Sequence, residues 1–150
     1  MIKPFVFALS VLLSAQCFAQ ITFVDSKMTW EQLSSQAKKE HKLIFIHIEG
    51  QGCEHCNEVA SQGFSAPVLK EKFEKHFIST RVRIESENGA RLATKFGLSQ
   101  PLVSVFANAD GNVLNKFYGS TSSGEMYLQH AETALERINK KPLEAFDKEY

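Results

Sequence analysis

The feature that most constrains the fold is the stretch LIFIHIEGQGCEHCNEVA, residues 43–60. It begins with a continuous apolar run rich in β-branched residues, which predicts a strand buried on both faces, as in a parallel sheet. The run stops at Gly50 and Gly52, and Cys53 and Cys56 follow at the spacing C-x-x-C, where a helical pattern starts. The sequence therefore predicts a strand, a turn and a helix, with the cysteine pair at the start of the helix.

Hydrophobic periodicity predicts the other elements of the chain. Thr29, with Gln32 three residues later, is typical of the start of a helix, and Asp110-Gly111 is a strong hairpin signal between two apolar runs. The predicted elements are helices over 28–42, 53–62, 67–77, 87–97 and 123–140, strands over 42–48 and 78–85, and a strand–turn–strand over 101–119. Their order predicts an α/β fold with one central mixed sheet, a parallel first pair of strands, a C-terminal antiparallel hairpin and helices on both faces.

The first 19 residues differ from the rest of the chain. Lys3 is followed by the apolar stretch FVFALSVLLSA, and the segment ends at the small residue Ala19. This pattern is typical of a secretory signal peptide, so we expect cleavage after Ala19, a domain over 20–140 and a loose C-terminal tail over 141–150. A membrane anchor and a lipoprotein modified at Cys17 are the alternatives. The apolar run is short for spanning a bilayer, and the residue before Cys17 suits lipidation poorly.

Charge and cysteine count limit the classes of function. Lys and Arg together number 17, as do Asp and Glu, so the formal net charge is zero, which argues against a nucleic-acid partner. After cleavage only Cys53 and Cys56 would remain of the three cysteines. A disulfide that closes so short a loop constrains the unfolded chain little, so chemistry explains the pair better than stability does.

The expected position of the cysteines suits thiol chemistry. Unpaired N–H groups and the dipole at a helix N-terminus stabilise an anion, and thiol pKa values fall in C-x-x-C motifs. We therefore expect Cys53 to be the attacking thiolate and the more buried Cys56 to be the resolving thiol, with a Cys53–Cys56 disulfide in the oxidised state. A protonated His55 would favour the thiolate, whereas the charge of Glu54 would oppose it. A solvent-facing His55 without a role is the alternative.

These residues resemble the thioredoxin superfamily, particularly its small exported members related to disulfide reductases and isomerases. The resemblance spans about residues 25–140 and rests on KLIFIHI, GCEHC opening a helix, VLKEKFEKHFISTRVRI and FGLSQPLVSVFANADGNVLNKFYG. It implies a thioredoxin-like fold and puts Pro101 where the family carries a cis-proline. Pro101, with Gln100 before it, is therefore expected to shape a substrate groove beside the disulfide. An ordinary trans proline is the alternative.

Two positions depart from the family pattern. Gly52 stands where an aromatic residue usually precedes the first cysteine. His47 stands where many members carry a buried acid that moves protons for the resolving thiol. In one interpretation the neutral imidazole of His47 accepts that proton and tunes the redox pair; in the other it is a core histidine. Glu49, near the end of the strand, is the second candidate acceptor.

The sequence thus predicts an exported thiol–disulfide oxidoreductase that acts through Cys53 and Cys56 without an organic cofactor. Its partners would be protein thiols or disulfides and a redox-regenerating protein, with no nucleic acid and no lasting membrane anchor. The expected location is the periplasm, with secretion or a secretory lumen as alternatives. The sequence resembles the reductase and isomerase branch, but the direction of electron flow, the clients and the oligomeric state are left open.

Two other classes of function fit less well. A metal-binding protein would need more ligands than Cys53 and Cys56, and the other histidines lie on separate predicted elements, so no metal site is assigned. A non-catalytic binding or chaperone module on the same fold would not need the cysteine pair. Its client groove would use Phe64, Phe96 and Tyr118, for which core packing is the other interpretation.

Overall fold

The computed structural model describes residues 20–138. The predicted signal peptide (1–19) and C-terminal tail (141–150) lie outside this range and stay predictions. The described chain forms helices α1 (Trp30–Glu40), α2 (Glu54–Phe64), α3 (Pro67–His76), α4 (Glu87–Lys95) and α5 (Gly124–Arg137), and strands β1 (Leu43–Glu49), β2 (Phe77–Arg83), β3 (Val103–Ala107) and β4 (Val113–Tyr118). All the elements predicted from periodicity are present, with bounds that differ by a few residues.

The strands form one mixed sheet in the order β2-β1-β3-β4. β1 and β2 run parallel, with His47 opposite Arg81, whereas β3 is antiparallel to both β1 and β4. This arrangement confirms the predicted parallel pair and the C-terminal hairpin. β1 has a strand on each side and is buried along its whole length, which explains why its sequence is almost continuously apolar.

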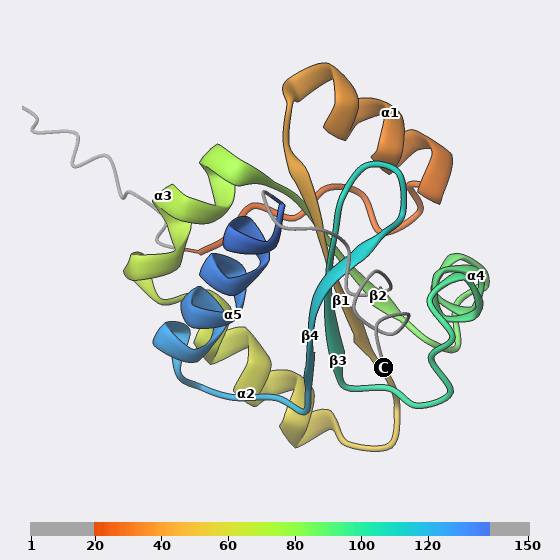
Figure 1. The fold of residues 1–150 in the computed structure, drawn as a ribbon. Coiled ribbons are helices and arrows are strands. Elements are labelled where there is room, and N and C mark those ends of the chain that lie inside the picture. Colours follow the sequence, from red (N-terminus) through yellow and green to blue (C-terminus); the bar gives the residue numbers. More distant parts are fainter. Residues whose placement is uncertain (1–19, 139–150) are drawn as a thin grey trace, which may run out of the picture.

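Different helices cover the two faces of the sheet (Figure 1). α1 and α4 lie on one face, and α2, α3 and α5 lie on the other. The first face, called here the aliphatic face, packs Leu33, Ile44, Ile46, Ile48, Leu92, Val103 and Val105. The second, called here the aromatic face, packs Phe45, Phe64, Phe73, Phe77, Phe106 and Tyr127. Because side chains alternate along a strand, His47 and Glu49 share the aromatic face with Phe45.

Local sequence signals set the ends of several elements. Thr29 Oγ1 accepts a hydrogen bond from the Gln32 N–H, and the Gln32 side chain accepts one from the Thr29 N–H, which confirms the predicted capping at α1. Pro67 occupies the first turn of α3, where its missing N–H costs nothing. Gly97 follows α4 with φ of +65°, and Gly111 turns the hairpin between β3 and β4 with φ of +92°.

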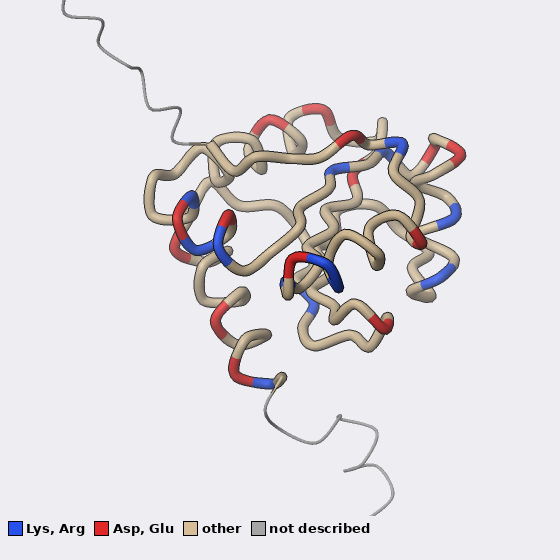
Figure 2. Tube along the Cα trace, turned by 90° about the horizontal axis from the view of Figure 1, so that it is seen from above, with Lys and Arg blue, Asp and Glu red and all other residues tan. Residues whose placement is uncertain are grey.

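Acidic and basic residues are interspersed along the described chain (Figure 2). The whole chain has 17 residues of each kind. Within residues 20–138, no helix combines the length and the hydrophobicity that crossing a membrane requires.

Candidate active site

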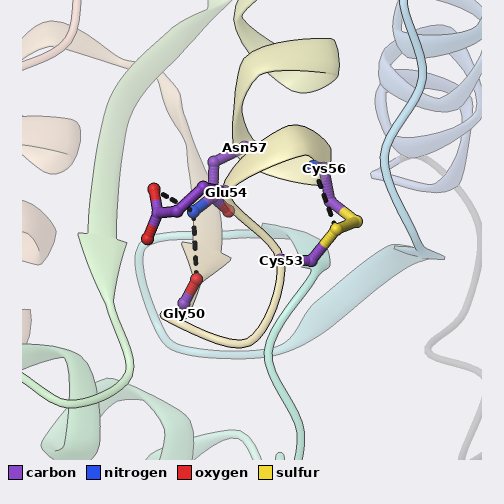
Figure 3. Close-up of a disulfide and its surroundings, with 5 residues drawn as sticks. All are labelled: Gly50, Cys53, Glu54, Cys56 and Asn57. Carbon is purple, nitrogen blue, oxygen red and sulfur yellow. Dashed lines mark hydrogen bonds between the residues drawn. A yellow bond between two sulfur atoms is a disulfide. The ribbon is translucent and has the colours of Figure 1, made fainter.

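The cysteine pair lies beyond the C-terminal end of β1, at the start of α2, as the sequence predicts. Cys53 is the N-cap of α2 and Cys56 lies in its first turn. The two form a disulfide with their Cα atoms 5.1 Å apart, a separation typical of disulfides. The Cys56 backbone N–H donates to Cys53 Sγ at 3.1 Å (Figure 3). This N–H belongs to the otherwise unpaired donors of the helix N-terminus, so it can stabilise a Cys53 thiolate after reduction.

Access to the sulfur atoms depends on their exposure. Both cysteines are half-buried in the oxidised protein. The predicted greater burial of Cys56 stays a prediction, because both residues fall in the same intermediate range of exposure.

The turn before the cysteines is fixed by groups from other parts of the chain. The Asn57 side-chain amide donates to Gly50 O at 3.0 Å, and the Gln51 N–H donates to Glu85 Oε1 at 2.6 Å (Figure 3 shows the first contact). Pro101 packs on the same turn, since a Cβ added to Gly50 would lie 2.9 Å from Pro101 Cβ. A glycine at position 50 therefore allows the proline ring to approach the backbone closely.

The structure corrects the expectation of a cis-proline. None of the peptide bonds within residues 20–138 is cis, so the bond from Gln100 to Pro101 is trans. An X-Pro bond favours the trans form by about 0.5–1 kcal/mol. The chain turns into β3 at Leu102 instead, whose φ of +63° is uncommon for a residue with a side chain. The Leu102 N–H donates to Ile48 O at 2.7 Å and anchors this turn beside β1. Gln100 and Pro101 are exposed.

His47 is fully buried in the middle of β1, with its ring against Phe64. Its Nδ1 lies 2.9 Å from Ser104 Oγ on β3, and its Nε2 has no hydrogen-bond partner in the described part of the chain. Burial, helped by the positive charge of Arg81, lowers the pKa of His47 from 6.5 to about 3. The imidazole is therefore neutral at neutral pH and is a weak proton acceptor.

One ion pair on the aromatic face was not predicted from the sequence. Arg81 Nε and Nη2 lie 2.8 and 2.7 Å from Glu49 Oε2, and the two side chains are only 19% and 12% exposed. The alternating pattern of residues 78–85 puts Arg81 on the polar face of its strand, and in the structure α2 covers that face. A signal was available: a carboxylate at the end of a buried strand needs a partner, and arginine is the usual one.

The two residues between the cysteines are exposed on the first turn of α2. Arg83 Nη2 donates to Glu54 Oε1 at 2.8 Å, and this bond, followed by that from the Asn57 amide, lowers the pKa of Glu54. Because Arg83 partly balances its charge, Glu54 opposes a Cys53 thiolate less than an isolated glutamate would. His55 makes no hydrogen bond or ion pair with the other described residues, and its tuning role stays a prediction.

The aromatic residues suggested for a client groove separate into two groups. Phe64 and Phe96 are buried in the two hydrophobic clusters, which confirms the core-packing interpretation for them. Tyr118, at the end of β4, is 67% exposed. Among residues 20–138, no three His, Cys, Asp or Glu side chains are arranged to hold a metal ion.

Comparisons with known proteins identify the fold. No protein-family model matches the sequence, and no curated protein matches it. A DsbH oxidoreductase is 18% identical with a TM-score of 0.65, covering 83% of this chain and 92% of its own. A thioredoxin from Thermus thermophilus is 13% identical with a TM-score of 0.63, covering 81% and 91%. A proposed disulphide-isomerase from Bacteroides thetaiotaomicron is 19% identical with a TM-score of 0.61, covering 81% and 96%. These similarities confirm the predicted thioredoxin-like fold.

Proposed function

We propose that the protein is a thiol–disulfide oxidoreductase that exchanges disulfides with other proteins through Cys53 and Cys56. The observation that carries the proposal is the position of the disulfide. It is half-buried at the N-terminus of α2, with the Cys56 N–H directed at Cys53 Sγ. The similar structures include an oxidoreductase and a thioredoxin, which supports the same use of the fold. A purely structural role explains the pair poorly, because the loop that it closes is very short.

In the reducing direction, the Cys53 thiolate of the dithiol form attacks one sulfur of a substrate disulfide. A mixed disulfide forms, and one substrate thiolate leaves and takes a proton from solvent. Cys56 then loses its proton and attacks Cys53 Sγ, so the intramolecular disulfide returns and the second substrate thiol leaves. Two electrons pass to the substrate in each cycle, and a reducing partner must return them to the Cys53–Cys56 disulfide.

The attack by Cys56 needs an acceptor for its proton. With a pKa of about 3, His47 holds a proton poorly at neutral pH. The Glu49 carboxylate lies on the same face, and Arg81 joins it to the backbone oxygen of Asn57, the residue after Cys56. Of the two candidates from the sequence, we propose Glu49 for testing as the acceptor. Replacing it in Glu49→Gln should slow the resolution of a mixed disulfide more than its formation.

The N-terminal segment supports an exported location, because Lys3, the apolar stretch and Ala19 follow the pattern of a cleaved signal. In the periplasm the protein would meet protein disulfides as substrates and another redox protein as its regenerator. The resemblance to reductases and isomerases favours electron flow from this protein to its clients. Gln100 and Pro101, beside the turn that precedes the disulfide, would line the substrate groove.

A trapping experiment tests the proposed function. Wild-type protein should accelerate the reduction of insulin by dithiothreitol, and Cys53→Ser should leave only the rate of dithiothreitol alone. Cys56→Ser keeps the attacking thiol and lacks the resolving one, so it should accumulate as a mixed disulfide that non-reducing electrophoresis detects. Full activity in Cys53→Ser would contradict the proposed mechanism.

A further inference from the structure

We infer that Arg81 is a positioning residue that holds the start of α2 against the sheet and thereby sets how readily the Cys53–Cys56 disulfide is reduced. The inference rests on the proposed disulfide exchange and adds to it the residue that adjusts its equilibrium.

The Arg81 guanidinium joins β2 to two other elements. Nε and Nη2 donate to Glu49 Oε2 on β1 at 2.8 and 2.7 Å. Nη1 donates to Ser61 Oγ at 2.8 Å, and Nη2 donates to Asn57 O at 2.8 Å, so both remaining contacts are on α2. The group also lies 5.5 Å from the centroid of the Phe64 ring. The planar guanidinium group has N–H donors in fixed directions, so it can make these contacts at the same time. A lysine ammonium cannot reproduce all of them.

Asn57 connects this group to the cysteines. It follows Cys56 directly, and its backbone oxygen receives both Arg81 Nη2 and the Ser61 hydroxyl, the latter at 3.0 Å. Its side-chain amide donates to Gly50 O, on the other side of the cysteines (Figure 3). Arg81 therefore fixes the residue that joins the two ends of the cysteine turn.

We expect the contacts by which Arg81 holds Asn57 to stabilise the reduced protein more than the oxidised one. In the oxidised state the disulfide itself restrains the loop between Cys53 and Cys56. After reduction that bond is gone, and the alignment of the Cys56 N–H with the Cys53 thiolate depends on how firmly α2 is held. Because a stabilised reduced form makes a disulfide more oxidising, Arg81 should raise the reduction potential of the pair.

Three variants separate the effect of the position of the Arg81 guanidinium from the effect of its charge. Arg81→Met combined with Glu49→Gln removes all the contacts of the guanidinium without leaving a carboxylate buried alone. Arg81→Lys keeps the charge and loses the fixed donor directions. Arg137→Met is the matched control, since Arg137 Nη1 donates to Leu114 O at 2.8 Å and fastens α5 to β4 at the opposite end of the sheet from the cysteines.

The measurement is the equilibrium constant with glutathione, in a Cys17→Ala background so that only the pair exchanges. Two glutathione thiols reduce the protein disulfide and leave as one glutathione disulfide, so electrons and protons balance. The double variant should lower the constant for reduction about tenfold, which equals about 30 mV. Arg81→Lys should lower it about threefold, and Arg137→Met should leave it within about twofold of the wild-type value.

Urea unfolding of both redox forms gives the difference in stability between the oxidised and the reduced protein. An arginine with a purely structural role would not affect this difference. The double variant should destabilise the reduced form more than the oxidised form, by the same factor as its glutathione constant falls. Equal destabilisation with an unchanged constant would overturn the inference, as would an Arg81→Lys variant identical to wild type, because charge alone would then act. The wild-type protein reports on the function itself: a pair that does not exchange with glutathione would refute the proposed function, whatever the variants do.

Discussion

On one face of β1, Ile44, Ile46 and Ile48 enter an aliphatic cluster beneath α1 and α4; on the other, His47 and Glu49 enter an aromatic layer beneath α2. The aliphatic face gains stability by removing hydrocarbon from water. Polar groups buried on the aromatic face lower stability unless they are paired. Stability therefore does not explain why they are there. The contrast puts the residues of the proposed chemistry on one side of the central strand.

Most of the unpaired buried atoms lie on the aromatic face. Within residues 20–138, His47 Nε2 and Asn57 Oδ1 are buried on the side of α2 without a hydrogen-bond partner, and Thr80 Oγ1 is a third such atom, on the aliphatic face. Leaving such an atom unpaired costs about 1–3 kcal/mol. Both residues lie next to the groups that we assign to the redox pair, since Asn57 holds the cysteine turn and His47 is opposite Arg81. Unpaired buried polar atoms that lower stability at this position are consistent with a functional site.

The largest effect on stability should come from the aliphatic face. Ile46→Ala removes a side chain that is fully buried and should lower the free energy of unfolding by about 2–5 kcal/mol. Its glutathione equilibrium constant should stay at the wild-type value, because the substitution leaves α2 untouched. Urea unfolding and glutathione titration check the two parts. A shift of the constant beyond about twofold, or about 9 mV, would show that the two faces are not separable.

The next effect depends on pH and comes from His47. Its pKa is about 3 in the folded chain against 6.5 in the unfolded one. Between these values the unfolded chain binds a proton that the folded chain does not, so the free energy of unfolding falls as the pH falls. The slope from this residue is at most about 1.4 kcal/mol per pH unit, and there is no contribution above about pH 7.

His47→Leu isolates this contribution. At about pH 7 the variant gains by removing the unpaired Nε2 and loses the hydrogen bond to Ser104 Oγ, so its stability should stay within about 1–2 kcal/mol of wild type. It should lose stability less steeply than wild type between about pH 6 and pH 4. Urea midpoints at several pH values give both slopes. Parallel pH profiles for the two proteins would refute the assignment of a strongly lowered pKa to His47.

A smaller effect should follow from removing the partner of His47. Ser104→Ala takes away the hydroxyl that lies 2.9 Å from His47 Nδ1 and should cost about 1 kcal/mol of unfolding free energy. Ser35→Ala, at an exposed position on α1, is the control and should change stability by less than about 0.5 kcal/mol. Equal unfolding curves for the two variants would mean that the hydroxyl does not pair with the imidazole.

The smallest effect should come from a pair outside both faces. Arg91 and Glu87 form an ion pair at 2.6 Å on α4, with side chains 70% and 81% exposed. Solvent screens such pairs, so Arg91→Met should change the free energy of unfolding by no more than about 0.5 kcal/mol. Urea unfolding at low and high salt checks this value. If Arg91→Met lowered the free energy of unfolding as much as Ser104→Ala does, the exposed surface of α4 would contribute more to stability than this account allows.

Sequence reasoning succeeded where the signals are local. The apolar strand, the capping at Thr29 and the start of α2 at the cysteines all depend on residues a few positions apart, so periodicity and turn chemistry reveal them. The contacts of Arg81 join residues 24 and 32 positions apart in sequence, with Asn57 and Glu49. They depend on strand register and helix placement, which composition and spacing do not contain.

The cis-proline expectation failed for a different reason. The resemblance put Pro101 correctly beside the turn that precedes the cysteines, as its contact with Gly50 shows. The isomer, however, is decided by less than about 1 kcal/mol of intrinsic preference and by local packing. Here the bond before Pro101 is trans, and the next residue, Leu102, has a φ of +63°.

The reduction potential of the Cys53–Cys56 pair, measured against glutathione and dithiothreitol mixtures, tests the central claim most directly. An exchanging pair should cycle by two electrons at a potential between about −270 mV, the value of a thioredoxin-like reductant, and about −120 mV, that of a strong oxidant. The lower part of this range would fit the proposed reductase or isomerase. A potential below about −300 mV, as structural disulfides have, would contradict the account and indicate that the pair has a structural role only.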